Sequence, residues 1–288
     1  MAYSGRLAII TGGLGGLGTA TATLLRQHSA RLALLYAPFE AARRDSILKS
    51  SFGSETPHDV RAYECDITSE SSIQSVFQQI SADTSSSTNP AFPSILINAA
   101  GYVSVQPLES TSADEAARNI LPNLLGPLLV SNAFYHLYTS RRAAAGTSAP
   151  PGRIVSISSQ AAHLALNGHG AYCASKAGLN GLTRCQANEW GRKGITANTV
   201  SPTVALTALG KKAWAEGKQR DDHLARIPTG RFVEPEEVAA AIEFLCRDEA
   251  GMITGGDVRI DGGFTTSGGF TMPGGDAAEG EATVGGGK

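Results

Sequence analysis

The chain has 288 residues, of which 42% are hydrophobic and 17% are charged, and this composition excludes a chain that is disordered along its whole length. Its 24 basic and 26 acidic residues leave a formal net charge of −2. Because they are interspersed, the sequence has neither the basic face of a nucleic-acid-binding protein nor an acidic tail, and small molecules are the expected partners.

Residues 1–10 carry a single Arg and a short apolar stretch, which is too little for a secretory signal. No run of apolar residues approaches the ~20 that a membrane span needs, so we expect a cytoplasmic protein that binds no membrane. The cysteines form no C-x-x-C pair, which favours reduced thiols over disulfides or a metal site. They are Cys65, Cys173, Cys185 and Cys246.

Segments rich in aliphatic and β-branched residues alternate with stretches of helical character. Each connection between parallel strands needs about a dozen residues, usually a helix. Apolar runs without polar alternation are typical of strands buried on both faces. We therefore predict one doubly wound α/β domain of the Rossmann type with about seven parallel strands. The predicted strands are residues 7–11, 32–36, 60–65, 95–98, 153–157, 195–200 and 258–260.

The folded domain is predicted to occupy residues 1–266. The Gly-rich segment 267–288 has almost no aliphatic residues and is predicted to be a disordered tail. Segments 81–93 and 143–152 are small, polar and Pro-rich, and we predict that both are surface loops.

The first predicted strand runs directly into T-G-G-L-G-G-L-G, residues 11–18, and a helix is predicted to begin near Leu17. A glycine cluster between a strand and a helix lets the backbone approach a pyrophosphate, and it directs N–H groups and the helix dipole at the negative charge. The segment predicts a dinucleotide site.

A second group of residues has the chemistry of proton transfer. Tyr172 and Lys176 are four positions apart on a predicted helix, hence on one face. A phenol with a pKa near 10 needs a neighbouring cation to work as a proton donor or base at neutral pH. Ser159 ends a predicted strand, where ligands of open parallel sheets gather.

The T-G-x-x-x-G-x-G spacing, Ser159 and the Y-x-x-x-K pair together resemble the classical short-chain dehydrogenase/reductase family, over about residues 5–264. Asp66 and Ile67, an N-A-A-G segment in place of N-N-A-G, and an S-P-T-V segment fit the same pattern. The resemblance implies the catalytic residues Asn123, Ser159, Tyr172 and Lys176. It implies contacts with the cofactor by Gly12, Leu14, Gly16, Leu17, Gly18, Tyr36, Asp66, Ile67, Asn98, Ala99, Ala100, Gly101, Tyr172, Lys176, Pro202, Val204 and Thr207.

The resemblance also implies a role for each catalytic residue. Tyr172 would exchange a proton with the substrate oxygen, and Ser159 would hydrogen-bond that oxygen. Lys176 would lower the pKa of Tyr172 and hold the nicotinamide ribose. Asn123 would support a chain of waters that returns the proton.

The end of the predicted second strand bears on the choice of cofactor. An Asp or Glu there would accept hydrogen bonds from the ribose hydroxyls of NAD and repel a 2′-phosphate, but this chain has Tyr36. Glu40 lies in the next segment, and Arg43 and Arg44 would reach a phosphate only if the chain folds back. The glycine motif itself has no basic residue. Because the acid is missing, we predict NADP(H) rather than NAD(H).

The segment between Ser159 and Tyr172 offers the side chains of Gln160, His163, Asn167 and His169 as hydrogen-bond partners, which suits a polyol or ketose. Within the family, the chain looks closest to the branch of L-xylulose (dicarbonyl) reductases and sugar alcohol dehydrogenases. That likeness implies a small polar substrate, NADPH and a homotetramer. It implies substrate contacts by Ser159, Gln160, His169 and Tyr172.

Two other functions remain open. A 3-oxoacyl-thioester reductase would share the catalytic residues and would need a basic patch for an acidic carrier, such as Lys211, Lys212, Lys218 and Arg220. A regulatory protein that binds a dinucleotide without turnover would share the fold. The charged segment 209–231 suits either a mobile lid or an ordinary pair of solvated helices.

Overall fold

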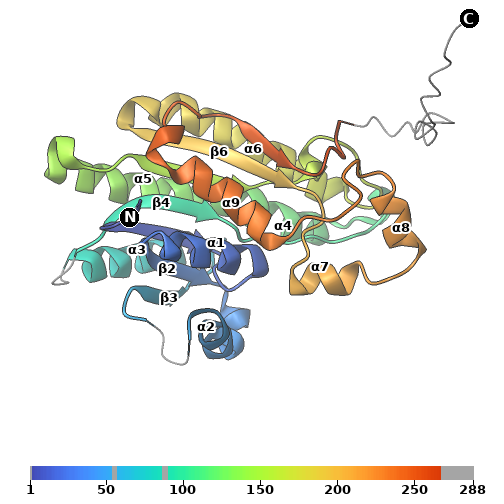
Figure 1. The fold of residues 1–288 in the computed structure, drawn as a ribbon, viewed down its shortest axis with the longest axis horizontal. Helices are drawn as coiled ribbons and strands as arrows, with labels where there is room; N and C mark the ends of the chain where they lie inside the picture. The colour runs from blue at the N-terminus through green and yellow to red at the C-terminus, as the bar shows by residue number, and fades with distance from the viewer. Residues whose placement is uncertain (1, 54–56, 86–89, 267–288) are drawn as a thin grey trace, which may run out of the picture.

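The computed structural model describes residues 2–53, 57–85 and 90–266. Its strands form one parallel sheet in the order β3-β2-β1-β4-β5-β6-β7 (Figure 1). The direction of strand addition reverses between β1 and β4, and such a switch point leaves a crevice at the carboxyl ends of the strands. The predicted fold and all seven predicted strands are confirmed. The strands are β1 Arg6–Thr11, β2 Arg31–Tyr36, β3 Val60–Glu64, β4 Phe92–Asn98, β5 Gly152–Ile157, β6 Ile195–Pro202 and β7 Asp257–Ile260.

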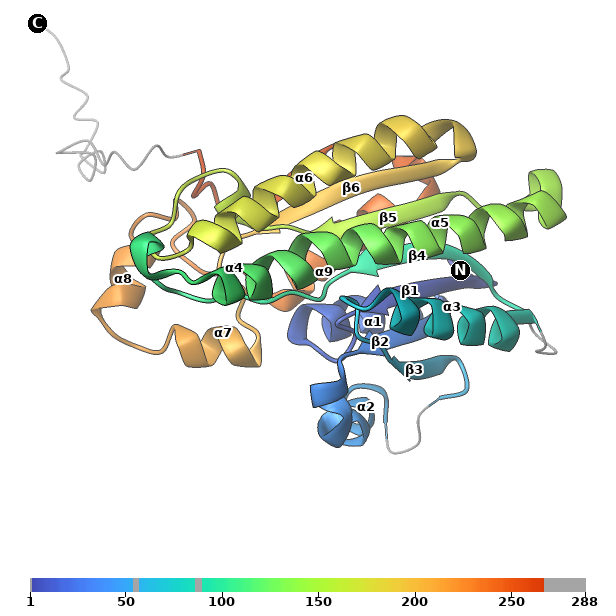
Figure 2. The same ribbon diagram turned by 180° about the vertical axis from the view of Figure 1, so that it is seen from behind.

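Helices cover both faces of the sheet (Figure 2). α1 and α9 lie on one face, and α3, α5 and α6 on the other. α4, α7 and α8 gather at the carboxyl end of the sheet. The α-helices are α1 Gly16–Gln27, α2 Arg44–Phe52, α3 Glu70–Ser85, α4 Ala113–Ile120, α5 Gly126–Ala145, α6 Gly170–Trp190, α7 Ala208–Ala213, α8 Lys218–Leu224 and α9 Pro235–Cys246. Shorter turns are η1 Pro38–Arg43, η2 Leu108–Ser110, the π-turn η3 Leu121–Leu125, η4 Gly146–Ser148, η5 Gln160–Ala162, η6 Gly191–Lys193 and η7 Asp248–Ala250.

Side chains of the inner strands alternate between two cores. Ile10 and Leu34 belong to the core beneath α1 and α9, and Ile9 and Leu35 to the core beneath α3 and α5. All four are at most 1% exposed, and burial of each such side chain contributes about 1.5–3 kcal/mol. The absence of polar alternation in these strands follows from their position between two layers of helices.

The prediction that segments 81–93 and 143–152 are loops is wrong at both ends of each segment. α3 continues to Ser85 and α5 to Ala145, while β4 begins at Phe92 and β5 at Gly152. The small polar residues of α3 remain helical because Arg141 of α5 donates to the Ser81 carbonyl at 2.8 Å and to Thr84 Oγ1 at 3.2 Å, whereas residues 143–145 are alanines, which favour a helix. Residues 86–89 and the predicted tail 267–288 lie outside the described residues.

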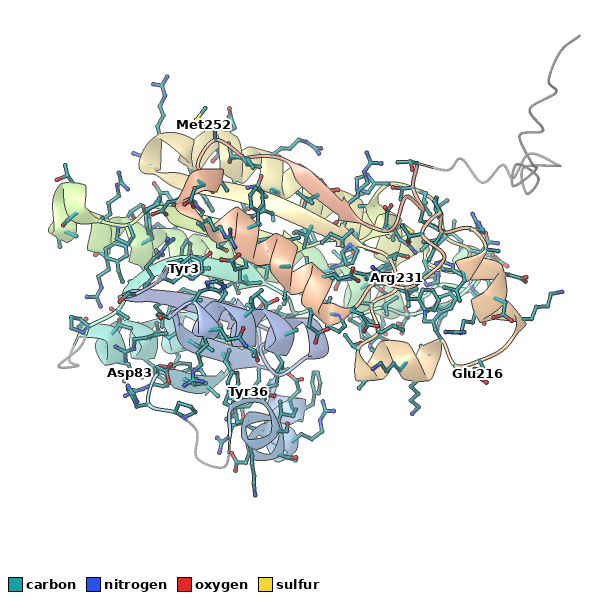
Figure 3. The ribbon with its side chains drawn as sticks, viewed as in Figure 1. Tyr3, Tyr36, Asp83, Glu216, Arg231 and Met252 are labelled. Atoms are coloured by element: carbon teal, nitrogen blue, oxygen red, sulfur yellow. The ribbon has the colours of Figure 1, made fainter. Side chains whose placement is uncertain are left out.

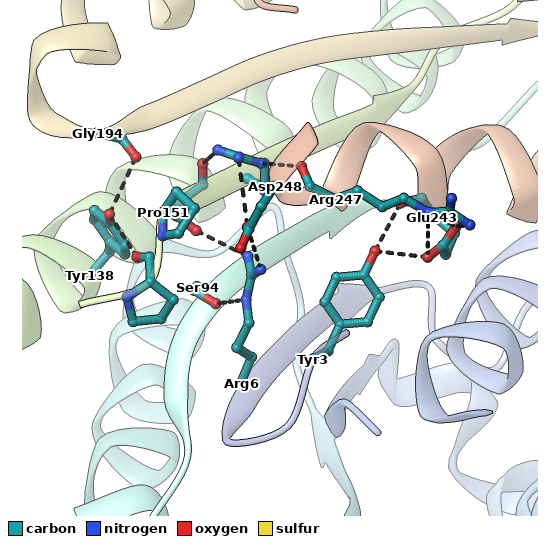
Figure 4. A network of polar contacts seen from close by, with 12 residues as sticks. Tyr3, Arg6, Ser94, Tyr138, Pro151, Gly194, Glu243, Arg247 and Asp248 are labelled. Atoms are coloured by element: carbon teal, nitrogen blue, oxygen red, sulfur yellow. Dashed lines mark hydrogen bonds and ion pairs between the residues drawn. The ribbon is translucent and has the colours of Figure 1, made fainter. Parts of the chain in front are cut away.

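A polar network closes the amino end of the sheet (Figure 4). The guanidinium of Arg6, on β1, donates to Ser94 Oγ at 2.8 Å, to the Pro151 carbonyl at 3.0 Å and to Asp248 Oδ1 at 3.2 Å. The Tyr3 hydroxyl donates to the Glu243 carboxylate on α9 at 3.0 Å. These contacts tie β1 to β4, β5 and α9, at the end of the sheet opposite the crevice.

Candidate active site

The glycine loop between β1 and α1 is shaped for close backbone approach. Gly12 has φ +61°, and a Cβ on it would lie 2.8 Å from the Ala100 backbone. A Cβ on Gly18 would lie 2.1 Å from the Gly12 carbonyl oxygen. Only glycine fits at both positions. Since no side chain caps the N-terminus of α1, its N–H groups remain available to an anion.

The segment after β4 is held against this loop. Thr11 Oγ1 accepts hydrogen bonds from the Ala99 and Ala100 amides at 3.1 and 3.2 Å. The Asn98 side chain, by contrast, donates to Ser156 Oγ at 3.0 Å and Ser131 Oγ at 3.3 Å, and it is 2% exposed. Asn98 therefore joins β4 to β5 and α5 through its side chain.

The glycine loop opens into a groove of about 1230 Å³, which we call the α1 groove. η1 and α2 form one wall, and α7 and the start of α9 form the other. Seven of the expected cofactor residues line it: Leu14, Gly16, Leu17, Gly18, Ala99, Gly101 and Thr207. Thr207 also caps α7 by accepting from the Gly210 amide at 3.1 Å, and a Cβ on Gly16 would collide with its methyl group at 2.5 Å. Gly16 thus permits the α7 segment to lie across the loop.

The other expected cofactor residues have local partners. Asp66 is exposed and accepts from the Thr68 amide at 2.9 Å. Ile67 packs on Gly126, where a Cβ would lie 2.8 Å from its Cδ1. Val204 accepts through its carbonyl from the Val233 amide at 3.1 Å. Pro202 is buried at the end of β6, and Tyr36 is buried at the end of β2.

Ser159, Tyr172 and Lys176 meet beyond the carboxyl end of β5. Ser159 begins η5, where its Oγ accepts from the Ala161 amide at 3.1 Å, and its hydroxyl also hydrogen-bonds the Tyr172 phenol. Lys176, one turn along α6 from Tyr172, has its Nζ 5.8 Å from the centre of the Tyr172 ring. The same Nζ donates to the Ile157 carbonyl at 2.7 Å. The structure brings together the three side chains that the sequence singled out.

Burial dominates the protonation of both titratable groups. It raises the pKa of Tyr172 above its ordinary value, and the hydrogen bond from Ser159 only partly opposes this. Burial lowers the pKa of Lys176 from 10.5 to about 8. We expected Lys176 to hold the pKa of Tyr172 below its ordinary value, but in this structure the desolvation of the phenol outweighs any such effect.

Asn123 lies in the π-turn η3 and is fully buried. Its amide exchanges two hydrogen bonds of 2.8 Å with the Tyr102 backbone and donates to Ser175 Oγ at 3.0 Å. A Cβ on Gly101 would lie 3.1 Å from Asn123 Oδ1 and 3.7 Å from Lys176 Nζ, so Asn123 is a neighbour of Lys176. The sequence analysis missed Ser175, although it directly precedes Lys176 in the Y-x-x-x-K motif.

Of the side chains proposed for substrate binding, His169 lies near the phenol and Gln160 is buried beside Ser159 in the chain. The His169 ring centre is 6.3 Å from that of Tyr172. Gln160 is 5% exposed, and its Oε1 has no hydrogen-bond partner among the described residues. His163 points elsewhere, because its Nε2 lies 2.8 Å from Asp257 Oδ2 on β7.

An aromatic cluster anchors α7 and α8, which the sequence left open as a lid. The His223 ring on α8 lies 4.7 Å from Trp214 and 4.7 Å from Phe264, and Trp214 lies 5.5 Å from Phe232. Leu164, from the segment between Ser159 and Tyr172, packs on the same cluster. Trp214 is therefore a structural anchor and not part of a solvated helix face.

A family model described as enoyl-(acyl carrier protein) reductase matches residues 12–265. A solved structure, a doubly substituted short-chain dehydrogenase/reductase of Serratia marcescens, superposes with a TM-score of 0.78 at 26% identity, covering 92% of this chain and 100% of that one. The chain belongs to the short-chain dehydrogenase/reductase family. It is an NAD(P)-dependent oxidoreductase that acts on CH–OH or carbonyl groups.

Several curated relatives are sugar alcohol dehydrogenases or ketose reductases. The chain is 38% identical to a D-threitol dehydrogenase of Mycolicibacterium smegmatis, over 91% of this chain and 93% of that protein. It is 36% identical to an NAD-dependent glycerol dehydrogenase of Listeria innocua, over 90% and 94%. It is 32% identical to an L-xylulose reductase of Bos taurus, over 91% and 97%. The sequence resemblance to this branch is confirmed.

Two classes of feature are absent from the part of the chain that the structure describes. It has no helix that is long and apolar enough to cross a membrane. It also has no cluster of His, Cys, Asp and Glu that could hold a metal ion.

Proposed function

We propose that this protein interconverts a small polyol and the corresponding ketose by transferring a hydride to or from a nicotinamide dinucleotide. The observation that carries the proposal is the meeting of Ser159, Tyr172 and Lys176 beside the glycine loop. The loop suits a dinucleotide, because the N-terminus of α1 has no side-chain cap and its N–H groups can bind the phosphates. The tight packing of Gly12 and Gly18 against neighbouring backbone holds the loop in this shape.

The bound cofactor supplies the hydride during reduction and accepts it during oxidation. During reduction, Tyr172 Oη donates its proton to the carbonyl oxygen of the substrate, and during oxidation it takes the proton from the alcohol. Ser159 Oγ hydrogen-bonds the same oxygen, and the ammonium of Lys176 stabilises the negative charge left on Tyr172. Asn123 fixes Ser175 and the Tyr102 backbone beside Lys176, at the start of a path for returning the proton.

The polar character of the substrate is supported by Gln160 and His169. A buried amide oxygen without a partner costs free energy that a substrate hydroxyl would recover, and Gln160 Oε1 is in that position. The relatives named for threitol, glycerol and xylulose support the same substrate class.

The competing function is reduction of a 3-oxoacyl thioester. The matching family model is named for an acyl carrier protein reductase, which favours an acyl substrate. Lys211 and Lys212 on α7 with Lys218 and Arg220 on α8 would face an acidic carrier.

A substrate screen distinguishes these functions. Purified protein is supplied with NAD, NADP or their reduced forms and with threitol, glycerol, L-xylulose, diacetyl or an acetoacetyl thioester, and the absorbance of the reduced nicotinamide is followed. We expect turnover of polyols and ketoses. Turnover confined to the thioester would favour the competing function, and cofactor binding without any turnover would favour a regulatory protein.

Three finer predictions from the sequence stay predictions. The choice of NADP(H) rested on the missing acid at Tyr36, and the NAD-dependent glycerol dehydrogenase among the relatives speaks against it. The homotetramer is testable by light scattering. Cell fractionation would test the cytoplasmic location.

A further inference from the structure

The end of β2 does not present Tyr36 to a ligand. Tyr36 is 4% exposed and belongs to the core beneath α1 and α9. Figure 3 places it where β2 passes into the segment of η1 and α2. The residue at the position expected to distinguish the two cofactors therefore cannot reach a ribose.

The carboxylate of Glu40, four residues after Tyr36, lies at the carboxyl end of β2. Glu40 folds back within η1, so that its Oε2 accepts a hydrogen bond from the Ala37 amide at 3.0 Å. Ala37 directly follows the last residue of β2. The other oxygen, Oε1, lies 3.7 Å from the Arg43 guanidinium, which is beyond hydrogen-bond distance. Oε1 thus keeps its capacity to accept a hydrogen bond.

Glu40 lines the α1 groove together with the glycine loop. Among the described residues, the charged side chains that line this groove are three acids, Glu40, Glu234 and Glu236, and two bases, Arg43 and Lys211. Arg43 is already paired with Glu40 at 3.7 Å. Arg44 does not add to the positive charge, because it is paired with Asp45 at 2.8 Å. Such a groove offers little net attraction to an added phosphate.

We propose that Glu40 accepts hydrogen bonds from the hydroxyls of the adenosine ribose and excludes a 2′-phosphate, so that this protein prefers NAD(H) to NADP(H). The inference rests on the proposed function, which places a nicotinamide dinucleotide in the α1 groove. It opposes the cofactor predicted from the sequence, because a linear sequence does not show that Glu40 returns to the end of β2.

The test is a binding measurement. The purified protein is titrated by calorimetry with NADH and NADPH, and separately with AMP and adenosine 2′,5′-bisphosphate, which differ only in the 2′-phosphate. We expect the ligands without the 2′-phosphate to bind at least about tenfold more tightly. Glu40→Gln should reduce this ratio by about tenfold, whereas Glu64→Gln, which removes an exposed carboxylate at the end of the neighbouring strand β3, should leave it unchanged.

The outcomes separate this inference from the function on which it depends. Equal or tighter binding of the 2′-phosphorylated ligands, or an unchanged ratio in Glu40→Gln, overturns the role of Glu40. The comparison of the two adenosine ligands uses the unaltered protein, so it holds even if Glu40→Gln weakens η1. Binding of neither dinucleotide overturns the proposed function itself. Selective binding of NADH without turnover of any polyol supports Glu40 and rejects the proposed substrate.

Discussion

The buried ammonium of Lys176 gives the stability of the fold a pH dependence. Its pKa is lowered from 10.5 to about 8 in the folded chain, so between these values the unfolded chain binds more protons than the folded one. Burial raises the pKa values of the Cys65 and Cys246 thiols, so these two groups lower the free energy of unfolding as the pH rises above 9. The contribution of Lys176 has the opposite sign, a rise of about 3 kcal/mol across its window. Urea denaturation at several pH values measures this rise.

Lys176→Met should abolish this rise, because it removes the group that titrates. Lys49→Met removes an exposed lysine of α2 and should preserve it. An identical slope in unaltered protein and Lys176→Met would show that other groups cause the pH dependence.

Replacing the Tyr172 phenol tests proton transfer without disturbing the cofactor groove. Tyr172→Phe removes the hydroxyl that Ser159 bonds, and we expect turnover to fall by a factor of about 10²–10⁴. The affinity for the dinucleotide, measured by calorimetry, should change little because the ring remains. Tyr63→Phe on β3 loses a hydroxyl that bonds Asp83 and should keep full turnover. Comparable turnover in both variants would exclude Tyr172 as the proton donor.

Motifs predicted that Ser159, Tyr172 and Lys176 lie together, because fixed spacings place Tyr172 and Lys176 on one face of a helix and Ser159 at a strand end. The roles of Glu40, Asn98 and His163 were not predictable in this way. Each depends on the direction of a single side chain, and the partners of Asn98 and His163 lie far along the chain.

At the scale of elements, α7 and α8 are held by few contacts. Their main apolar anchor is the cluster of Trp214, His223, Phe232 and Phe264. Trp214→Ala should release this segment without unfolding the sheet, since local opening needs only the loss of local contacts. We expect trypsin to cleave after Lys211, Lys212 or Lys218 about tenfold faster.

The control for proteolysis is Met252→Ala, which truncates a side chain that is 96% exposed and lies outside the cluster. It should be cleaved at the rate of the unaltered protein. Unchanged cleavage of Trp214→Ala would mean that the cluster does not hold the segment in place.

The strands were predicted correctly from the sequence, whereas the ends of α3 and α5 were not. Parallel strands buried on both faces consist of apolar runs that are visible in the sequence. The end of α3 is instead stabilised by Arg141 of α5, which donates to the Ser81 carbonyl and to Thr84 Oγ1. That stabilisation is tertiary, whereas Ser and Thr alone favour turns.

At the scale of the whole molecule, the candidate active site lies at one end of the sheet and a structural polar network lies at the other. The carboxyl end holds the glycine loop and the side chains that we propose to be catalytic, while the amino end is closed by the network around Arg6 (Figure 4). Arg6 is 5% exposed and Arg153 is 3% exposed, and both face Asp248, at 3.2 and 3.9 Å. Burial, and then the charge of Arg6, lower the pKa of Arg153.

Arg6→Ala should therefore destabilise the fold without changing the chemistry. It leaves Ser94 Oγ and the Pro151 carbonyl without their donor, and we expect a loss of about 2–4 kcal/mol in the free energy of unfolding. Denaturation by guanidinium measures this loss, and kcat at a temperature where both proteins are folded should stay the same. Arg231→Ala, which breaks the exposed pair with Glu237, should shift the midpoint far less. If the two variants lose equal stability, the buried contacts of Arg6 do not hold the amino end together. If kcat falls in Arg6→Ala, the two ends of the sheet are coupled.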